Sequence, residues 1–520
     1  MQLKWKRPLY LLHRWAGIVL CAFFALWFFS GVFMMYVEFP QLTRQERLAG
    51  LPALDFHAAT LHPGAAVARL RAADFDTVGS PSRNQTLAVE NGDAAVEVGA
   101  VTPLMRLGRP LYRVQAHGQA QPRVVDARSG AVLPRVGVDE AGAIAADFAA
   151  RAYGGAPQPR YLQTLQTDQW AVSSSLNAHR PLHLFALDDA AGTELYVSSS
   201  TGEVVRDSVR VERWLNYPAA VTHWLYPTAI RRYPDAWAWM VDILSAAGGV
   251  LALSGLWIGL LRWKRRPRPG KSSIPYKGLM RWHHIGGLAF GMVTLTWVIS
   301  GLLSMNPGKL NPPRSPSPEQ QQVFSGKPLT PGDFSLPRFD GDVVEAEPLH
   351  YFGQPLWQLT HRDGRVELRG GGDVPPTLPD AAAMQARAAL LLPDASLQDV
   401  QMLSRYDDYY YTRHPERGSH PLPVLRVRFA DAAATWFHLD PARGRILDRS
   451  TRINRLYRWL YNGLHSWDIR WLRERRPLWD IAVISFSFGG FALSMTGVVI
   501  GWRRLRMGAR RQQSSLQSTG

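Results

Sequence analysis

Five histidines at the ends of long apolar segments are the residues whose type and spacing could support metal chemistry in this chain. They are His13, His223, His283, His284 and His465. Imidazole nitrogen is a common metal ligand. Ionisable residues in or beside a segment that crosses hydrocarbon are functional candidates, because apolar surroundings disfavour them unless a partner is present.

Four of the five histidines recur in pairs at fixed sequence offsets. His13 and His283 are separated by 270 residues, and His223 and His465 are separated by 242. We therefore expect each pair to act as a pair of ligands. His284 has no counterpart, since position 14 is an arginine. We assign His284 a secondary role, such as a hydrogen bond to a propionate group of a bound porphyrin or to a lipid headgroup.

Glycines accompany the first pair. Gly17 follows His13 by one helical turn, and Gly287 follows His283 by one turn, so each lies on the same helix face as its histidine. A porphyrin is a flat plate, and a helix that supplies its axial imidazole must leave space beside that ligand. Gly31 lies five turns beyond His13 on the same face. The alternative is that these histidines contact headgroups and that the glycines allow close helix packing.

The single cysteine, Cys21, restricts the type of cofactor. One cysteine cannot hold a thiolate iron–sulfur cluster or form the CxxCH attachment of c-type haem. Imidazole pairs are the usual axial ligands of b-type haem. The pairs thus indicate two bis-histidine haems b near opposite faces of the membrane. For His223 and His465 the alternative is an ordinary position in the aromatic belt at the membrane surface.

Four apolar segments reach the roughly 20 residues that a helix needs to cross the bilayer core. The first shows no small-residue cleavage site after its apolar run, so we interpret it as an anchor and not as a signal peptide. The expected parts are, in order, transmembrane helix 1 (1–37), an external domain (38–236), helix 2 (237–262), a loop (263–278), helix 3 (279–305), a second external domain (306–477), helix 4 (478–502) and a tail (503–520).

The net charge of +17 is concentrated beside these apolar segments. Basic runs occupy the residues before position 9, residues 262–271 and residues 503–511. Lys and Arg collect on the cytoplasmic side of membrane proteins, so both termini and the 263–278 loop are predicted to be cytoplasmic. The external domains are then periplasmic and the membrane is a bacterial inner membrane. This placement of charge argues against binding to nucleic acid.

The two halves of the chain resemble each other. Ser30 and Gly31 match Ser300 and Gly301 at an offset of 270. A glycine stripe matches at an offset of 242: Gly248, Gly255 and Gly259 correspond to Gly490, Gly497 and Gly501. We interpret the stripes as helix-packing surfaces. A duplication with halves in parallel order predicts a pseudo-twofold axis along the membrane normal, with helix 1 opposite helix 3 and helix 2 opposite helix 4.

The external segments have the patterns of an α+β fold. Alternating apolar residues around polar, glycine-containing turns predict strands at 122–133, 193–205 and 434–447. Helical periodicity occurs at 139–153 and 380–392. Residues 102–114 resemble residues 347–359, which extends the repeat to the external domains. The expected fold class is therefore an α+β membrane protein with four transmembrane helices.

Two further features of the sequence are compatible with a binding site at the periplasmic surface of the inner membrane. Residues 405–427 concentrate carboxylates, tyrosines, arginines and histidines, and they either line a substrate site or form a solvated loop. Five arginines lie on the expected outer side of the membrane, where basic residues are unusual, and could contact haem propionates or another anionic ligand. They are Arg231, Arg232, Arg473, Arg475 and Arg476.

Several short motifs occur in an order that is typical of one known family. They are "LHRWAGI", "WHHIGGL", "VVDARSGAVL", "YVSSSTGEVV", "HLDPARGRIL" and the closing segment "RLYRWLYNGLHSWDIRWLRERRPLWDIAV" followed by "TGVVIGWRRL". Together they extend over nearly the whole chain. In this combination the sequence resembles the PepSY-associated transmembrane family.

That resemblance implies two periplasmic PepSY-like domains above the helices. Similar proteins include inner-membrane siderophore reductases, which hold haem b between membrane histidines and pass electrons outward to ferric iron. Carried over to this sequence, the haem ligands are His13, His283, His223 and His465. Larger relatives add a cytoplasmic flavin and nicotinamide module, whereas no GxGxxG or P-loop pattern follows helix 4 here. The expected electron donor is therefore a separate reductase, a free reduced flavin or a quinol.

The resemblance thus implies a ferric-siderophore reductase type of oxidoreductase, with a ferric chelate or siderophore as the periplasmic partner. The alternative is a haem-free PepSY membrane protein that binds or regulates a periplasmic peptide, protease or envelope component. A metal or siderophore transporter is disfavoured, because the four spans place no acidic residue deep in the hydrocarbon.

Overall fold

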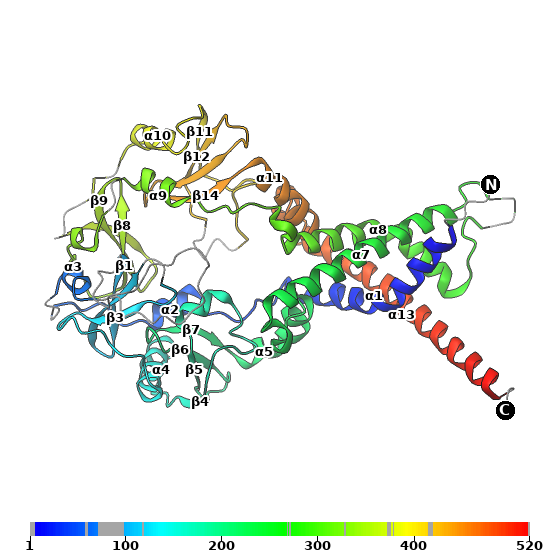
Figure 1. Ribbon diagram of the computed structural model, residues 1–520, viewed down its shortest axis with the longest axis horizontal. Helices are drawn as coiled ribbons and strands as arrows, with labels where there is room; N and C mark the ends of the chain where they lie inside the picture. The colour runs from blue at the N-terminus through cyan, green and yellow to red at the C-terminus, as the bar shows by residue number, and fades with distance from the viewer. Residues whose placement is uncertain are drawn as a thin grey trace, which may run out of the picture.

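The computed structural model describes residues 6–57, 61–70, 98–116, 119–267, 269, 272–326, 329–371, 376–377, 379–413 and 420–517. A bundle of long helices occupies one end of the molecule, and a β-rich region occupies the other (Figure 1). The chain is thus an α+β protein. Four of its helices are long and apolar enough to cross a membrane, as in a multi-pass membrane protein.

The four long helices are α1 (Lys6–Met34), α7 (Pro234–Arg262), α8 (Gly278–Ser304) and α13 (Leu478–Gln517). Each coincides with one expected membrane segment, although α1 ends before residue 37 and α13 continues beyond residue 502. Large apolar side chains such as Val19, Leu253 and Phe488 are exposed on their outer surfaces. Exposure on this scale is unfavourable in water and is expected where lipid covers the helices.

The helices are arranged so that α1 packs beside α7 and α13, and α8 packs beside the same two helices. Consequently α1 lies diagonally opposite α8, and α7 lies opposite α13. Glycine permits the close approach: a Cβ atom at Gly248 would lie 2.8 Å from the ring of Phe24. The apolar core between the helices includes Leu20, Phe28 and Val298.

The part of the chain that connects α1 to α7 forms two antiparallel sheets. The first has the order β1-β2-β3 and the second has the order β4-β5-β6-β7. Their strands are β1 (Val98–Arg106), β2 (Arg109–Ala116), β3 (Arg123–Asp126), β4 (Arg160–Leu165), β5 (Leu182–Ala186), β6 (Glu194–Ser198) and β7 (Val204–Ser208). Helices α2 (Arg44–Gly50), α3 (Pro63–Val67) and α4 (Val138–Ala152) accompany them.

The region between α8 and α13 contains the same kinds of sheet. Their orders are β10-β9-β8 and β11-β12-β13-β14. The strands are β8 (Val343–Tyr351), β9 (Gln354–His361), β10 (Val366–Gly370), β11 (Leu397–Leu403), β12 (Val424–Phe429), β13 (Trp436–Asp440) and β14 (Arg445–Ser450). Helices α9 (Pro318–Ser325) and α10 (Ala381–Ala389) accompany them. The strands and helices expected at 193–205, 434–447, 139–153 and 380–392 are confirmed.

The segments 102–114 and 347–359, which resemble each other in sequence, both form a hairpin. Leu107 and Gly108 join β1 to β2, and Phe352 and Gly353 join β8 to β9. All four residues have positive φ angles between 49° and 81°. Two successive positive φ angles define the two-residue turn whose twist matches that of paired strands.

The four-stranded sheets are each covered by helices. Phe148 of α4 packs on Phe185 and Leu195 of the first sheet. Met384 of α10 and Phe324 of α9 occupy the corresponding place on the second. The three-stranded sheets meet far from the bundle, where β1 contacts β8 (Figure 1).

Backbone and side-chain contacts join the two external regions. The N–H of Leu54 donates to the carbonyl of Val343 over 2.8 Å, and Arg47 forms an ion pair with Glu345. Arg362 donates to carbonyl oxygens at the end of α2. The external regions are therefore held to each other as well as to the bundle.

Short helical segments connect each external region to the helix that follows. They are α5 (Arg210–Asn216), a π-helical turn (Tyr217–Val221) and α6 (Thr228–Arg231) before α7, and α11 (Arg452–Arg458), a π-helical turn (Trp459–Gly463) and α12 (Arg470–Arg473) before α13. The first π-turn packs on α1 and the second packs on α8. π-Turns are rare and often occur at functional sites.

Candidate functional site

His13 on α1 and His283 on α8 face each other across the bundle. Their ring centroids are 6.4 Å apart. The Nδ1 atom of His13 lies 3.2 Å from Oγ of Ser254 on α7, and Nδ1 of His283 lies 2.8 Å from Oγ1 of Thr496 on α13. We call these two histidines the inner pair. Each is held by a hydroxyl from a neighbouring helix.

His223 and His465 form a second pair, which we call the outer pair. Their ring centroids are 6.2 Å apart. Nδ1 of His223 lies 3.1 Å from Oγ of Ser30 on α1, and Nδ1 of His465 lies 3.1 Å from Oγ of Ser300 on α8. Each histidine follows a π-helical turn, which brings its ring back onto a long helix. The structure thus brings together the residues of both expected pairs.

The four hydroxyls determine which ring nitrogen carries the hydrogen. Each hydroxyl donates its own hydrogen to a backbone carbonyl three or four residues earlier in its helix. The acceptors are the carbonyls of Leu26, Leu251, Trp297 and Leu493. The hydroxyl oxygens must therefore accept from the imidazoles, so Nδ1 is the protonated nitrogen in all four rings. The lone pairs of the four Nε2 atoms have no hydrogen-bond partner in the part of the chain that the structure describes.

The spacing of the rings fits a shared metal. Two imidazoles that bind one metal from opposite sides, each through a bond of about 2.0 Å, have ring centres roughly 6.3 Å apart. The observed values are 6.4 and 6.2 Å. Among the described residues no group of three or more His, Cys, Asp or Glu side chains could hold a bare ion. Haem needs only two axial ligands from the protein, so this donor set fits haem.

Glycines lie beside all four imidazoles. An added Cβ atom would lie 2.7 Å from Cε1 of His13 at Gly255 and 3.4 Å from Cε1 of His223 at Gly31. Gly31 lies on the same helix face as His13 and was expected to leave space beside that residue. It instead contacts His223 of the outer pair, because α1 is long enough to reach both histidine pairs. At Gly287 an added Cβ would meet no atom within 4 Å, so space remains beside His283.

The two pairs lie at different depths in the bundle. Ser30 follows His13 by 17 positions, which correspond to about 26 Å along an α-helix. Aromatic side chains fill the interval: Phe24 stacks on Trp27 at 6.1 Å, and Phe28 lies 5.7 Å from Trp297. The pairs are thus separate centres with apolar packing between them.

His284 belongs to neither pair. It is 7% exposed, its ring lies 5.3 Å from that of Tyr276, and its Nε2 atom has no partner among the described residues. One residue along a helix turns the side chain by about 100°, so His284 cannot face the same partner as His283.

Sequence reasoning missed the hydroxyl partners. Ser254 and Thr496 are related by the same offset of 242 as His223 and His465, and each directly precedes a glycine of the stripe. That recurrence was a usable signal. The sequence repeat matched Ser30 with Ser300, but it did not predict that these serines accept hydrogen bonds from the outer pair. Gly255 was assigned to helix packing, whereas the structure also places it against His13.

The described part of the 405–427 segment forms a buried polar network; residues 414–419 lie outside the described residues. Arg426 forms an ion pair with Asp407 and donates to Nε2 of His438 over 2.8 Å. His438 in turn donates to Asp448, which also pairs with Arg314. Burial opposes ionisation of Asp448, but these two partners outweigh it and lower the pKa of the carboxyl group. The members satisfy one another, which is typical of a structural network.

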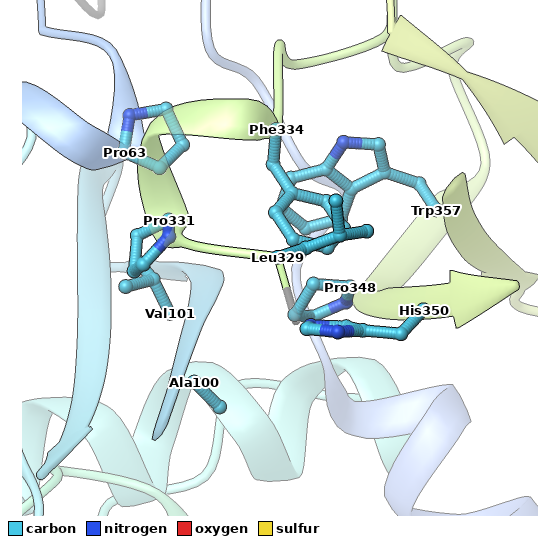
Figure 2. Close-up of a pocket in the computed structure, with 9 residues that line it drawn as sticks. All are labelled: Pro63, Ala100, Val101, Leu329, Pro331, Phe334, Pro348, His350 and Trp357. Carbon is cyan, nitrogen blue, oxygen red and sulfur yellow. The ribbon is translucent and has the colours of Figure 1, made fainter. Parts of the chain in front are cut away.

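A hollow lies where the two external regions meet. Pro63 and Val101 from one region and Phe334, His350 and Trp357 from the other line it, as Figure 2 shows. Its volume of about 10 Å³ is close to the minimum for one water molecule. It is too small for an organic substrate.

No protein-family model matches this sequence, and no curated protein sequence matches it either. The helices define the class, a multi-pass membrane protein. Its function is therefore argued from the two histidine pairs.

Proposed function

We propose that this chain is an inner-membrane haem b protein that moves electrons from the cytoplasmic side to a ferric chelate in the periplasm, as in the PepSY-associated reductases that its motifs resemble. The inner pair and the outer pair would each hold one haem through Nε2. Bound haem iron supplies one-electron redox chemistry.

One observation carries this proposal: four histidines, each with Nδ1 bonded to a hydroxyl and with Nε2 unpartnered among the described residues, lie in two pairs whose ring centroids are 6.4 and 6.2 Å apart. Ring nitrogens without a partner in an apolar bundle are unfavourable unless a ligand binds them. Ser254, Thr496, Ser30 and Ser300 orient the rings, as groups behind metal ligands commonly do.

The duplicated, pseudo-twofold architecture forms part of the proposal. The offset of 242 relates Ser254 to Thr496 and also His223 to His465. Both external regions contain a three-stranded and a four-stranded sheet, which would be the two PepSY-like domains. The basic residues at the ends of α7 and α13 favour a cytoplasmic position for the inner pair and a periplasmic position for the outer pair. A separate donor would then reduce the inner haem.

An absorbance spectrum of the detergent-purified protein tests the proposal. We expect a Soret band that shifts and sharpens on reduction by dithionite, and two haems b per chain in a pyridine haemochrome assay. His13→Ala and His223→Ala should each leave one haem, and electron paramagnetic resonance should show six-coordinate low-spin iron in the remaining site. His284→Ala, the matched control beside His283, should keep two. A colourless protein from haem-replete cells would refute the proposal and favour the haem-free alternative.

The direction of transfer needs its own experiment. Protein in sealed vesicles that contain a reductant would be mixed with an external ferric chelate and a colorimetric Fe(II) chelator. Each electron that crosses the membrane reduces one Fe(III) to Fe(II), which hard-oxygen chelators bind far more weakly. We expect Fe(II) to appear outside with wild-type protein and not with His13→Ala.

A further inference from the structure

We propose that three arginines beside the outer pair, Arg413, Arg458 and Arg473, form a carboxylate site, and that its ligand is a propionate of the haem at the outer pair. We call these residues the outer arginine cluster. The identity of the ligand rests on the proposed function, whereas the site itself is argued from the contacts of the cluster.

Arg458 is the central member. It is the last residue of α11, and it is only 5% exposed. Its Nη2 atom donates to the backbone carbonyl of Asp468. Its Nε and Nη1 atoms are buried and have no partner among the described residues. A buried guanidinium with open donors is strongly unfavourable, so this arrangement indicates an anionic group that accepts from them.

The open donors of Arg458 lie close to the outer pair. A Cβ atom added at Gly463 would be 3.9 Å from Nη1 of Arg458, and His465 follows Gly463 by two residues. The connecting backbone is the π-helical turn that directs the His465 ring onto α8. Arg458 therefore lies beside the peptide that carries one of the proposed ligands.

Arg473 adds a further open donor. Its Nη1 atom is buried without a partner among the described residues, and its guanidinium lies 4.1 Å from the ring centroid of Tyr411. Arg458 approaches the same ring at 5.1 Å. The Tyr411 hydroxyl donates to Asp468 over 3.0 Å. Tyr411 and Asp468 thus hold the cluster together from one side.

Arg413 completes the cluster and gives it an excess of positive charge. It donates to Oδ1 of Asp468 at 3.0 and 2.8 Å. The other nearby carboxylate is Asp408, 3.7 Å from Arg458. Asp407 is already paired with Arg426. Among the described residues, the three guanidinium groups of the cluster thus have two carboxylates beside them, and one more anion would balance their charge.

The segment after His223 contains a further arginine with an open donor. Arg231 corresponds to Arg473 at the offset of 242, and its Nε atom is also buried without a partner among the described residues. It stacks on Trp237 at 4.8 Å, and Trp237 donates to the carbonyl of Trp224, the residue after His223. Haem carries two propionates, and an arginine with an open donor is thus connected by contacts to the segment of each histidine of the outer pair.

Reconstitution with modified haem tests the assignment. Protein made without haem would be titrated with haem and with haem dimethyl ester, in which both propionates are neutral esters. Wild-type protein should bind haem at the outer pair at least about tenfold more tightly than the ester, since hydrogen bonds to a charged group are worth that much. Arg458→Gln should bind the two almost equally and should lower the midpoint potential of the outer haem. Arg470→Gln is the matched control, because Arg470 is exposed and paired with Glu474.

Three results would overturn the assignment. One is an equal loss of affinity for haem and ester in Arg458→Gln, which would indicate a purely structural role. Another is wild-type protein that does not discriminate between them. The third is thermal stabilisation of His465→Ala protein by phosphate or citrate that depends on Arg458, since it would assign the cluster to a free anion. A wild-type protein that binds neither haem nor ester would instead refute the proposed function.

Discussion

Nδ1 of His283 donates a hydrogen bond of 2.8 Å to Oγ1 of Thr496, and that hydroxyl donates its own hydrogen to the carbonyl of Leu493. The threonine can therefore act only as an acceptor toward the histidine. The contact joins α8 to α13 across 213 residues of sequence.

Thr496→Val should weaken haem binding at the inner pair by about 10- to 100-fold, the usual effect of removing a group that orients a metal ligand. Valine keeps the shape of threonine but cannot accept from Nδ1. Haem titration of the apoprotein measures the change. Thr296→Val is the control, because the Thr296 hydroxyl on α8 also donates to its own helix and has no hydrogen bond to a histidine among the described residues. Equal losses in both variants would show that the hydroxyl has no specific role.

Gly255→Ala should remove the inner haem and leave the outer one. The added Cβ atom would lie 2.7 Å from Cε1 of His13, so the imidazole must leave the position that it holds opposite His283. A haemochrome assay should fall from two haems to one per chain. Gly286→Ala places its Cβ at an ordinary 3.5 Å from Leu493 and should keep both haems. Retention of two haems in Gly255→Ala would show that His13 is not held in this position.

Gly64→Ala should loosen the junction between the two external regions. Its Cβ atom would lie 2.6 Å from Cα of Gly332, and backbone cannot move aside as a side chain can. Overpacking of this kind typically costs about 1–3 kcal/mol. Thermal unfolding should show the loss, and limited proteolysis should become faster. Gly341→Ala meets no atom within 4 Å and should behave as wild type.

Asp207→Asn should change how stability depends on pH. Burial, followed by the charge of Glu46, raises the pKa of Asp207 to about 7, although Tyr153 donates to its carboxylate over 3.0 Å. Between about pH 4 and pH 7 the folded protein holds a proton that the unfolded chain has released, so this group's contribution to stability falls as pH rises. The amide can still accept from Tyr153 and does not ionise.

The Asn variant should accordingly match wild type near pH 4 and be more stable above pH 7, by at most about 4 kcal/mol. Melting temperatures from pH 4 to pH 8 provide the measurement. Asp189 is a control of opposite sign: burial disfavours its charge, but hydrogen bonds from Thr193 prevail and lower its pKa. Asp189→Asn should be less stable than wild type above about pH 4, and the difference should shrink only as the pH falls below 4. Parallel curves for wild type and Asp207→Asn would contradict the assignment.

Local sequence patterns predicted much of the fold. The helices α4 and α10, the turns at Gly202 and Gly444, and the four long apolar helices all follow from periodicity and from residues that favour turns. These features depend on neighbours within a few positions. The ends of α1 and α13 differed from expectation, because apolar composition indicates where lipid lies and not where helical hydrogen bonding stops.

The candidate site likewise has some features that the sequence predicts and others that only the tertiary structure shows. The sequence by itself determined which histidines pair, because residues at matched positions of two similar halves lie at similar depths. Only the tertiary structure decided which ring nitrogen is free, since Ser254 contacts His13 from 241 positions away. It also placed Nη1 of Arg458 beside Gly463, two residues before His465, and turned His284 away from both pairs. Those outcomes depend on which helix faces are in contact, and packing between distant segments fixes that choice.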